Sequence, residues 1–142
     1  MDEKAKAEAE DYGNTTAKDW IGKLDELAKA APISIPESAK TSVQSKIGYE
    51  QIKYSWDNGV YKYEIRWHTR TPGAPADQKN TWIVERTTHG NATGQIKTRH
   101  IYTQKKEWVK KYDWQEALRA YQKGVASDAQ RLLLESGHWK AP

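Results

Sequence analysis

The sequence contains no cysteine and no phenylalanine, and only one methionine among its 142 residues. Without cysteine, the chain can form no disulfide, offers no thiolate nucleophile and has no cysteine ligand for zinc or an iron–sulfur cluster. No run of about 18 apolar residues occurs, so no segment is suited to cross a membrane as a helix. The first residues lack the basic-then-apolar pattern of a secretory signal, so we expect any export to depend on another part of a longer protein.

Aliphatic side chains are also scarce, since Leu, Ile and Val together account for 20 of the 142 residues. So low a fraction is typical of disordered chains, but 7 Trp and 8 Tyr compensate, because each large ring can bury roughly 150–250 Å². The length fits one domain. We therefore predict a flexible linker over residues 1–16 and a single domain over residues 17–142 with an aromatic core.

The net charge of +4 is distributed unevenly along the chain. Residues 1–57 carry a net charge of −3, whereas residues 58–142 carry +7. A basic stretch rich in aromatic residues suggests a polyanionic partner, with nucleic acid favoured over a membrane surface. Charge alone leaves a second interpretation open, in which the basic residues form a solvated face with no partner.

The N-terminal part of the domain, residues 17–48, is predicted to be helical. Within residues 19–31, apolar side chains recur at i, i+4 and i+7, and Pro32 ends the pattern. Residues 38–47 are predicted to form a second, short helix that stops at Gly48.

Residues 49–70 carry a strong signal for a β-hairpin. Asn58-Gly59 lies between two runs of alternating polar and apolar residues, which is typical of a two-residue turn. Such a turn places the aromatic and aliphatic side chains on one face and the charged side chains on the other. The predicted cross-strand pairs are Trp56 with Tyr61, Tyr54 with Tyr63, Ile52 with Ile65, and Lys53 with Glu64.

The rest of the chain predicts two further strands, over residues 81–88 and 96–103, and two helices, over residues 113–123 and 128–136. Asp113 and Ser127 are expected to cap the two helices at their N-termini, and Gly124 is expected to follow the end of the first. The predicted fold class is α+β, with N-terminal helices followed by an antiparallel sheet of four or more strands. We expect the helices to cover the aromatic face of this sheet and to leave a basic face open.

Candidate catalytic residues cluster on the polar side of the second hairpin strand. Arg66, His68 and Arg70 alternate, so all three are expected to project from one face. A histidine can move a proton to or from an oxygen, and two flanking arginines can hold a phosphate. Alternatively, each of these residues is merely a polar residue on a half-exposed sheet.

Other elements add further candidates. Glu85 and Arg86 come from the predicted strand 81–88. His138, near residue 142, could be a second acid or base, or it could simply cap the edge of the core. The candidate RNA-binding residues are Arg86, Lys97, Arg99, His100 and Thr103.

The motifs of metal and nucleotide sites do not occur. There is no His-Glu-x-x-His motif, no cluster of carboxylates and histidines at ligand spacing, no dinucleotide-binding glycine motif and no P-loop. We therefore expect neither a metal nor any other cofactor.

Three segments resemble the C-terminal toxin domains of bacterial polymorphic toxins, in LXG-type secreted toxins and contact-dependent growth inhibition effectors. They are residues 63–75 (YEIRWHTRTPGAP), residues 81–86 (TWIVER) and residues 136–140 (SGHWK). The resemblance covers roughly residues 49–140 and implies a metal-independent ribonuclease with a barnase/EndoU/colicin/RelE-like fold. It implies RNA, commonly tRNA, as substrate, and catalysis by residues within these segments, namely Arg66, His68, Arg70, Glu85, Arg86 and His138.

The same resemblance implies a biological setting. Such toxins are delivered as parts of larger secreted or cell-surface proteins, act in the cytoplasm of a target bacterium, and are neutralised by a cognate immunity protein. Taken without the resemblance, the residues are also compatible with two other functions. One is an RNA-binding module without catalysis, and the other is a protein-interaction domain that binds an acidic partner.

Overall fold

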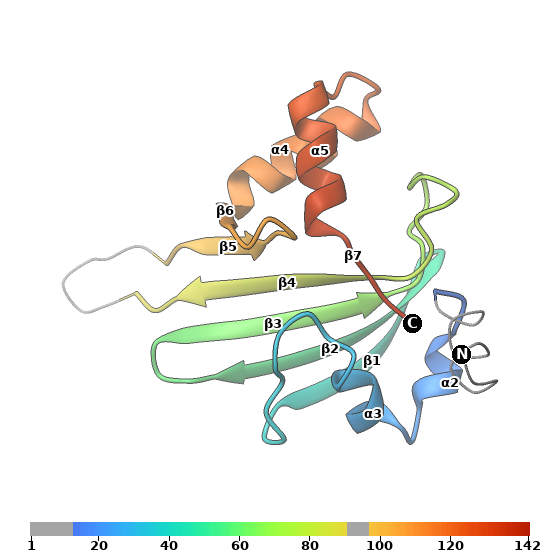
Figure 1. The fold of residues 1–142 in the computed structure, drawn as a ribbon, viewed down its shortest axis with the longest axis vertical. Helices are drawn as coiled ribbons and strands as arrows, with labels where there is room; N and C mark the ends of the chain where they lie inside the picture. Colours follow the sequence, from blue (N-terminus) through green and yellow to red (C-terminus); the bar gives the residue numbers. More distant parts are fainter. Residues whose placement is uncertain (1–12, 91–96) are drawn as a thin grey trace, which may run out of the picture.

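The fold is built around one antiparallel sheet, seen in a computed structural model that describes residues 13–90 and 97–142 (Figure 1). Six strands follow one another in the order β1-β2-β3-β4-β5-β6, and β7 pairs with β4 outside this path. The strands are β1 (Lys40–Lys46), β2 (Tyr49–Asp57), β3 (Tyr61–His68), β4 (Thr81–Thr88), β5 (Arg99–Tyr102), β6 (Trp108–Lys110) and β7 (Trp139–Lys140). This arrangement confirms the α+β class and the antiparallel sheet. The expected linker over residues 1–16 lies mostly outside the described residues.

The hairpin of β2 and β3 is confirmed, but its predicted register is wrong by two residues. Trp56 pairs with Tyr63 rather than with Tyr61. The reason is a longer turn, in which the Asn58 side chain accepts hydrogen bonds from the backbone amides of Val60 and Tyr61. A shift of two residues keeps every side chain on its predicted face.

Residues 40–46 form the edge strand β1, so the helix predicted over residues 38–47 is wrong. β1 pairs with β2 along its whole length, and Gly48, at a φ of +82°, takes the left-handed conformation in the turn between them. The exposed fraction of Val43 is 42%. Pairing with β2 therefore decides the conformation of this segment, since its apolar side chains contribute little to the core.

The helix predicted over residues 19–31 is confirmed only in part, because the segment is broken into α2 (Ala17–Trp20) and α3 (Leu24–Ala28). Gly22 lies between them with a φ of +88°, a left-handed conformation that ends an α-helix. Both helices pack on the aromatic face of the sheet. Leu27 is fully buried there, and the Tyr54 hydroxyl donates a hydrogen bond of 2.6 Å to the carbonyl of Leu24.

The aromatic face of the sheet forms the larger core, as expected. Its buried strand residues come from β2, β3 and β4, and both Trp67 and Trp82 are fully buried. The side chain of Trp67 donates a hydrogen bond of 3.0 Å to the carbonyl of Pro142, which fixes the C-terminal end against the sheet.

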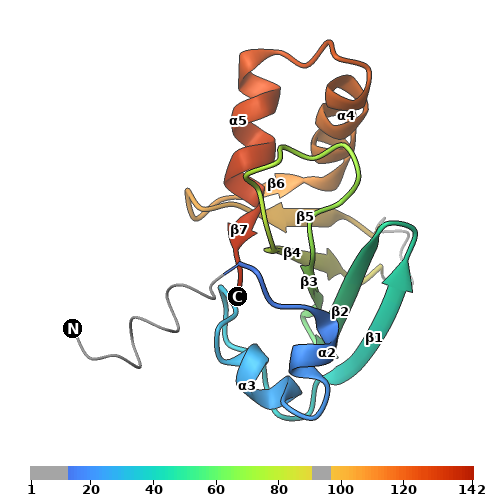
Figure 2. The same cartoon turned by 90° about the vertical axis from the view of Figure 1, so that its right-hand side faces the viewer.

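The opposite face is not open, so the expectation of an uncovered basic face is wrong. Helices α4 (Lys111–Gln122) and α5 (Asp128–Gly137) pack over its β4–β5 side. Trp114 and Leu134 from these helices meet Ile83 and Ile101 in a second core. The helix pairs therefore lie at opposite ends of the molecule, α4 and α5 at the top and α2 and α3 at the bottom (Figure 2).

The predicted ends of the last two helices are partly confirmed. Ser127 caps α5 by accepting a hydrogen bond of 3.1 Å from the amide of Gln130, and Gly124 follows the end of α4 in a left-handed conformation. Asp113 is not the N-cap of α4, because the helix begins at Lys111 and Asp113 lies within its first turn.

Candidate active site

A cleft of about 550 Å³ lies between the loop after β3, the end of α4, α5 and β7. The three sequence segments that resemble toxin domains all contribute to it. From residues 63–75 come Thr71, Pro72, Ala74 and Pro75; from residues 81–86 comes Thr81; and from residues 136–140 come His138 and Lys140. Segments far apart in the sequence therefore build one site.

Strand pairing brings these segments together. In the register of β4 and β7, Thr81 lies opposite Lys140 and Trp82 opposite Trp139. The end of the chain is held by Asn80, whose carbonyl accepts a hydrogen bond of 3.1 Å from the amide of Ala141 and whose side chain donates one of 2.9 Å to the carbonyl of Pro142.

Gly137 allows α5 to end close to the sheet. A Cβ atom at this position would lie 2.3 Å from Cζ3 of the Trp114 ring, so only glycine fits without displacing that ring. The close approach places His138, the next residue, beside Trp114, with the two ring centroids 5.1 Å apart.

The hydrogen bonding of His138 determines which of its nitrogens can accept a proton. Its Nδ1–H donates a hydrogen bond of 2.6 Å to the carbonyl of Leu134, so the neutral ring carries its free electron pair on Nε2. Burial lowers the pKa of His138, and the Leu134 carbonyl only partly opposes this effect. The ring is therefore neutral at pH 7 and available as a base.

His68 lies one layer beneath the cleft, behind Thr81 and His138. Its exposed fraction is 4%, and burial, with smaller effects of His138 and Arg66, lowers its pKa to about 4. Nδ1–H donates to the carbonyl of Thr69 at 3.0 Å, and Nε2 accepts from the hydroxyl of Thr81 at 3.3 Å. With both nitrogens engaged, the geometry suits His68 to positioning Thr81 and His138.

Arg66 and Glu85 belong to a chain of ion pairs on the same face of the sheet. The Arg66 guanidinium contacts Glu64 and lies 3.4 Å from Glu85, and Lys111 Nζ lies 2.7 Å from Glu85. Lys53 extends the chain, at 3.7 Å from Glu64. Burial alone would raise the pKa of Glu64, but the charge of Arg66, aided by Lys53, outweighs it and lowers this pKa. The pairs thus stabilise the charged form of Glu64.

Arg70 is not grouped with Arg66 and His68 as its spacing predicted, because β3 ends at His68. Its Nε donates a hydrogen bond of 3.0 Å to the carbonyl of Pro75, and its Nη2 donates to the carbonyl of Ala74. Arg70 thus fixes the loop that forms one wall of the cleft.

The remaining predicted residues do not share one surface. Arg86 lies on the aromatic face of the sheet, against the rings of Tyr61 and Trp108, and its cross-strand partner His100 lines a pocket beside α4. Thr103 is 2% exposed and therefore buried, whereas Lys97 and Arg99 are exposed.

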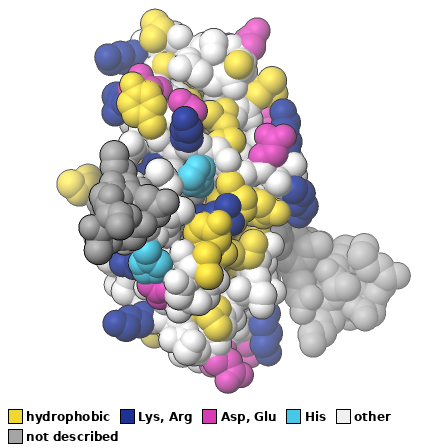
Figure 3. Space-filling view, turned by 90° about the vertical axis from the view of Figure 1, so that its left-hand side faces the viewer, with side chains coloured by type: hydrophobic (Ala, Val, Ile, Leu, Met, Phe, Trp, Pro, Cys, Tyr) yellow, Lys and Arg dark blue, Asp and Glu magenta, His cyan; other side chains and the backbone are white. Residues whose placement is uncertain are grey.

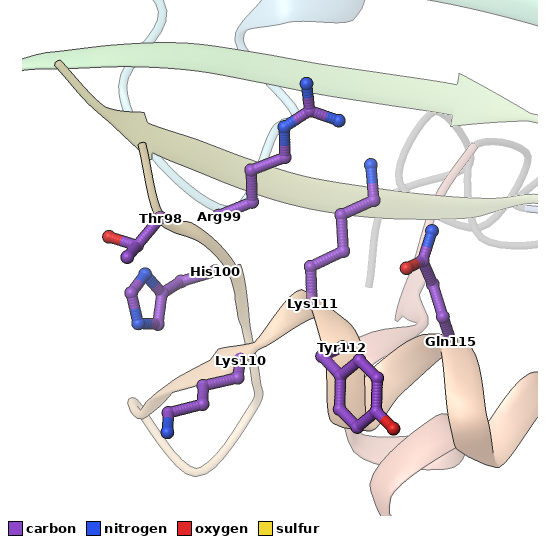
Figure 4. Close-up of a pocket in the computed structure, with 7 residues that line it drawn as sticks. All are labelled: Thr98, Arg99, His100, Lys110, Lys111, Tyr112 and Gln115. Carbon is purple, nitrogen blue, oxygen red and sulfur yellow. The ribbon is translucent and has the colours of Figure 1, made fainter. Parts of the chain in front are cut away.

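A second, smaller pocket of about 300 Å³ lies where β5, β6 and α4 meet (Figure 4). Four of its lining residues are basic, namely Arg99, His100, Lys110 and Lys111, and none is acidic. Arg99 and Lys111 extend in one direction, toward β4, whereas His100 and Lys110 extend in the other (Figure 4). These side chains therefore do not converge on one point, and Lys111 is already paired with Glu85.

Sequence reasoning missed Thr81, Lys140 and the helical wall of the cleft. The sequence predicts only that Thr81 belongs to a strand, and no pattern in it indicates that a two-residue strand at 139–140 pairs with β4. The Pro- and Gly-containing segment 71–75 reads as a loop, but its role as a cleft wall depends on the position of α5.

Comparisons with known proteins found no matching family, no similar curated protein and no similar solved structure. Within residues 13–90 and 97–142, no group of three or more His, Asp and Glu side chains could hold a metal ion. Over the same residues, no helix is both long and apolar enough to span a membrane. The resemblance to toxin domains therefore stays a prediction.

Proposed function

We propose that this chain is a ribonuclease toxin domain that cleaves RNA at the cleft around His138. The observation that supports this proposal most strongly is the convergence on that cleft of the three toxin-like segments, together with a neutral histidine and a lysine. We include in the proposal the finer assignment of the fold to the barnase/EndoU/colicin/RelE-like group.

The proposed reaction uses the 2′-hydroxyl of the RNA as nucleophile. Nε2 of His138 takes the proton of that hydroxyl, the 2′ oxygen bonds to phosphorus, and the bond from phosphorus to the 5′ oxygen breaks. The leaving oxygen takes a proton from water, which leaves a 2′,3′-cyclic phosphate and a 5′-hydroxyl end. A positioned general base of this kind typically contributes about 10²–10⁴-fold to the rate.

Lys140 would act on the phosphate. It lines the same cleft as His138 and follows it by two residues, and the proposal assigns its ammonium group to the phosphate on which His138 acts. A cation in this position offsets the extra negative charge of the transition state. His68 would orient Thr81 and support the His138 ring without contacting the substrate.

The biological part of the proposal is delivery into a target bacterium and inhibition by an immunity protein. The charge distribution supports an acidic inhibitor, because residues 58–142 carry a net charge of +7. Complementary charge would give fast and selective association.

Incubation of the purified protein with total tRNA in the presence of EDTA tests the proposed function. We expect cleavage products that end in a cyclic phosphate. Binding without cleavage would instead indicate an RNA-binding module, and neither binding nor cleavage would indicate a protein-interaction domain; both results would contradict the proposal.

A further inference from the structure

A continuous row of side chains crosses five strands on the aromatic face of the sheet. Strand register places Trp56 opposite Tyr63, Tyr63 opposite Arg86, Arg86 opposite His100, and His100 opposite Lys110. We call these five residues the cross-strand row. With neighbouring strands about 4.8 Å apart, the row is roughly 19 Å long.

The aromatic and cationic groups of the row are stacked on one another. The rings of Trp56 and Tyr63 stack with centroids 5.2 Å apart. The Arg86 guanidinium lies between two further rings, 4.1 Å from the centroid of Tyr61 and 4.1 Å from that of Trp108. Aromatic surface therefore lines one half of the row, and positive charge follows it toward β6.

This part of the aromatic face is accessible. Helices α2 and α3 cover the sheet near Tyr54 and Trp67, in rows further along the strands. Lys110 is exposed, and the other members of the row are half-buried. Figure 3 shows hydrophobic side chains gathered around cationic groups near the middle of the face that presents the β2–β3 turn and β5.

The Nε atom of Arg86 is buried and has no hydrogen-bond partner among the described residues, so a phosphate would bind the outer nitrogens of the guanidinium. The row itself contains no acidic side chain, and two of its residues, His100 and Lys110, also line the basic pocket between β5, β6 and α4. His100 and Lys110 thus extend the basic half of the row toward this pocket.

We propose that the cross-strand row binds single-stranded RNA, on the opposite face of the sheet from the cleft around His138. Unpaired bases would stack on Trp56 and Tyr63, and their phosphates would bind Arg86, His100 and Lys110. Duplex RNA does not offer base faces for stacking, so single strands are preferred. The inference rests on the proposed function only for the choice of RNA as ligand.

Equilibrium binding to a labelled eight-nucleotide oligouridylate tests the inference. The full chain carries His138→Gln in these measurements, so that the RNA is not consumed, and the duplex of the same oligomer with oligoadenylate is the comparison. We expect tighter binding of the single strand. Trp56→Leu removes a stacking ring and should raise the Kd for the single strand about fivefold or more. Circular dichroism reports whether this variant folds.

Lys110→Gln provides an independent measurement at an exposed residue. Loss of one phosphate contact should reduce the slope of log K against log salt by about 0.7. Lys123→Gln is the matched control, because Lys123 is exposed at the end of α4, away from the row, and its slope should equal that of the parent protein. The salt dependence of Lys110→Gln tests binding at the row even if Trp56→Leu does not fold.

Equal binding of single strand and duplex, or an unchanged salt slope in Lys110→Gln, would overturn the inference and would favour a protein partner for the row. Failure of the proposed function is detected separately. If the wild-type protein does not cleave RNA but binds the single strand through the row, the ribonuclease proposal fails and this inference stands.

Discussion

The rings of His68 and His138 meet edge to face, with centroids 6.0 Å apart. One ring comes from the end of β3 and the other from the residue after α5, so two segments distant in the sequence share one small volume. Both pKa values are lowered, chiefly by burial. Two neutral imidazoles can pack together in this way, whereas two charged ones would repel each other.

Stability should fall as the pH falls below neutrality, because burial makes His68 harder to protonate in the folded state than in the unfolded chain. The pKa of His68 is about 4 when folded, against about 6.5 in an unfolded chain. Between these values the unfolded state binds the proton more readily, so the free energy of unfolding decreases. We expect a loss of about 2 kcal/mol from this residue between pH 7.5 and pH 5.

Urea unfolding of the wild type and of His68→Gln at several pH values measures this effect. The variant should show a smaller decrease over the same range, although it starts from a lower stability at pH 7.5. Parallel pH profiles for the two proteins would mean that His68 is not the residue responsible.

Gly137→Ala should destabilise the protein through a single added carbon. The new Cβ would lie 2.3 Å from the buried Trp114 ring, so either the ring or the end of α5 must move. Overpacking of this kind costs about 1–3 kcal/mol, measured as the loss in the free energy of unfolding.

A double-mutant cycle of Gly137→Ala with Trp114→Leu tests whether the Trp114 ring causes the destabilisation. The smaller side chain makes room for the methyl group, so the double variant should be more stable than the sum of the single effects predicts. Strict additivity would show that the Trp114 contact is not what excludes a side chain at position 137.

Glu85→Gln should weaken the fold, because Glu85 holds two cations in a largely buried position. The exposed fraction of its side chain is 8%, and its carboxylate lies within 3.4 Å of Arg66 and 2.7 Å of Lys111. Removal of one partner from such a network typically costs about 3 kcal/mol. Glu116→Gln is the control, since its pair with Arg119 is exposed and its loss should cost less than about 1 kcal/mol. Equal losses in the two variants would contradict a structural role for the ion-pair chain.

The fold class could be predicted because its strongest signals are local. The alternation on both sides of Asn58-Gly59 determines which side chains of β2 and β3 face the core. A slip of two residues leaves that assignment intact, which explains why the faces were predicted correctly and the register was not. The capping of α5 by Ser127 is equally local.

The errors fall where long-range contacts decide the structure. Residues 40–46 become a strand because β2 offers them a partner, and their own pattern does not require it. The expected open face is covered because α4 and α5 fold back onto Ile83 and Ile101. The grouping of His138 with Thr81 depends on β7, a strand of two residues without a sequence signal.

The most direct test of the account is the rate of RNA cleavage by His138→Gln, measured in EDTA under single-turnover conditions and beside His89→Gln. His89 is exposed and pairs with Asp57 near the β2–β3 turn, so it serves as a histidine control remote from the cleft. We predict that His138→Gln retains the wild-type circular dichroism spectrum and cleaves about 10²–10⁴-fold more slowly, whereas His89→Gln cleaves at the wild-type rate. A folded His138→Gln protein that cleaves RNA as fast as the wild type would contradict the central claim.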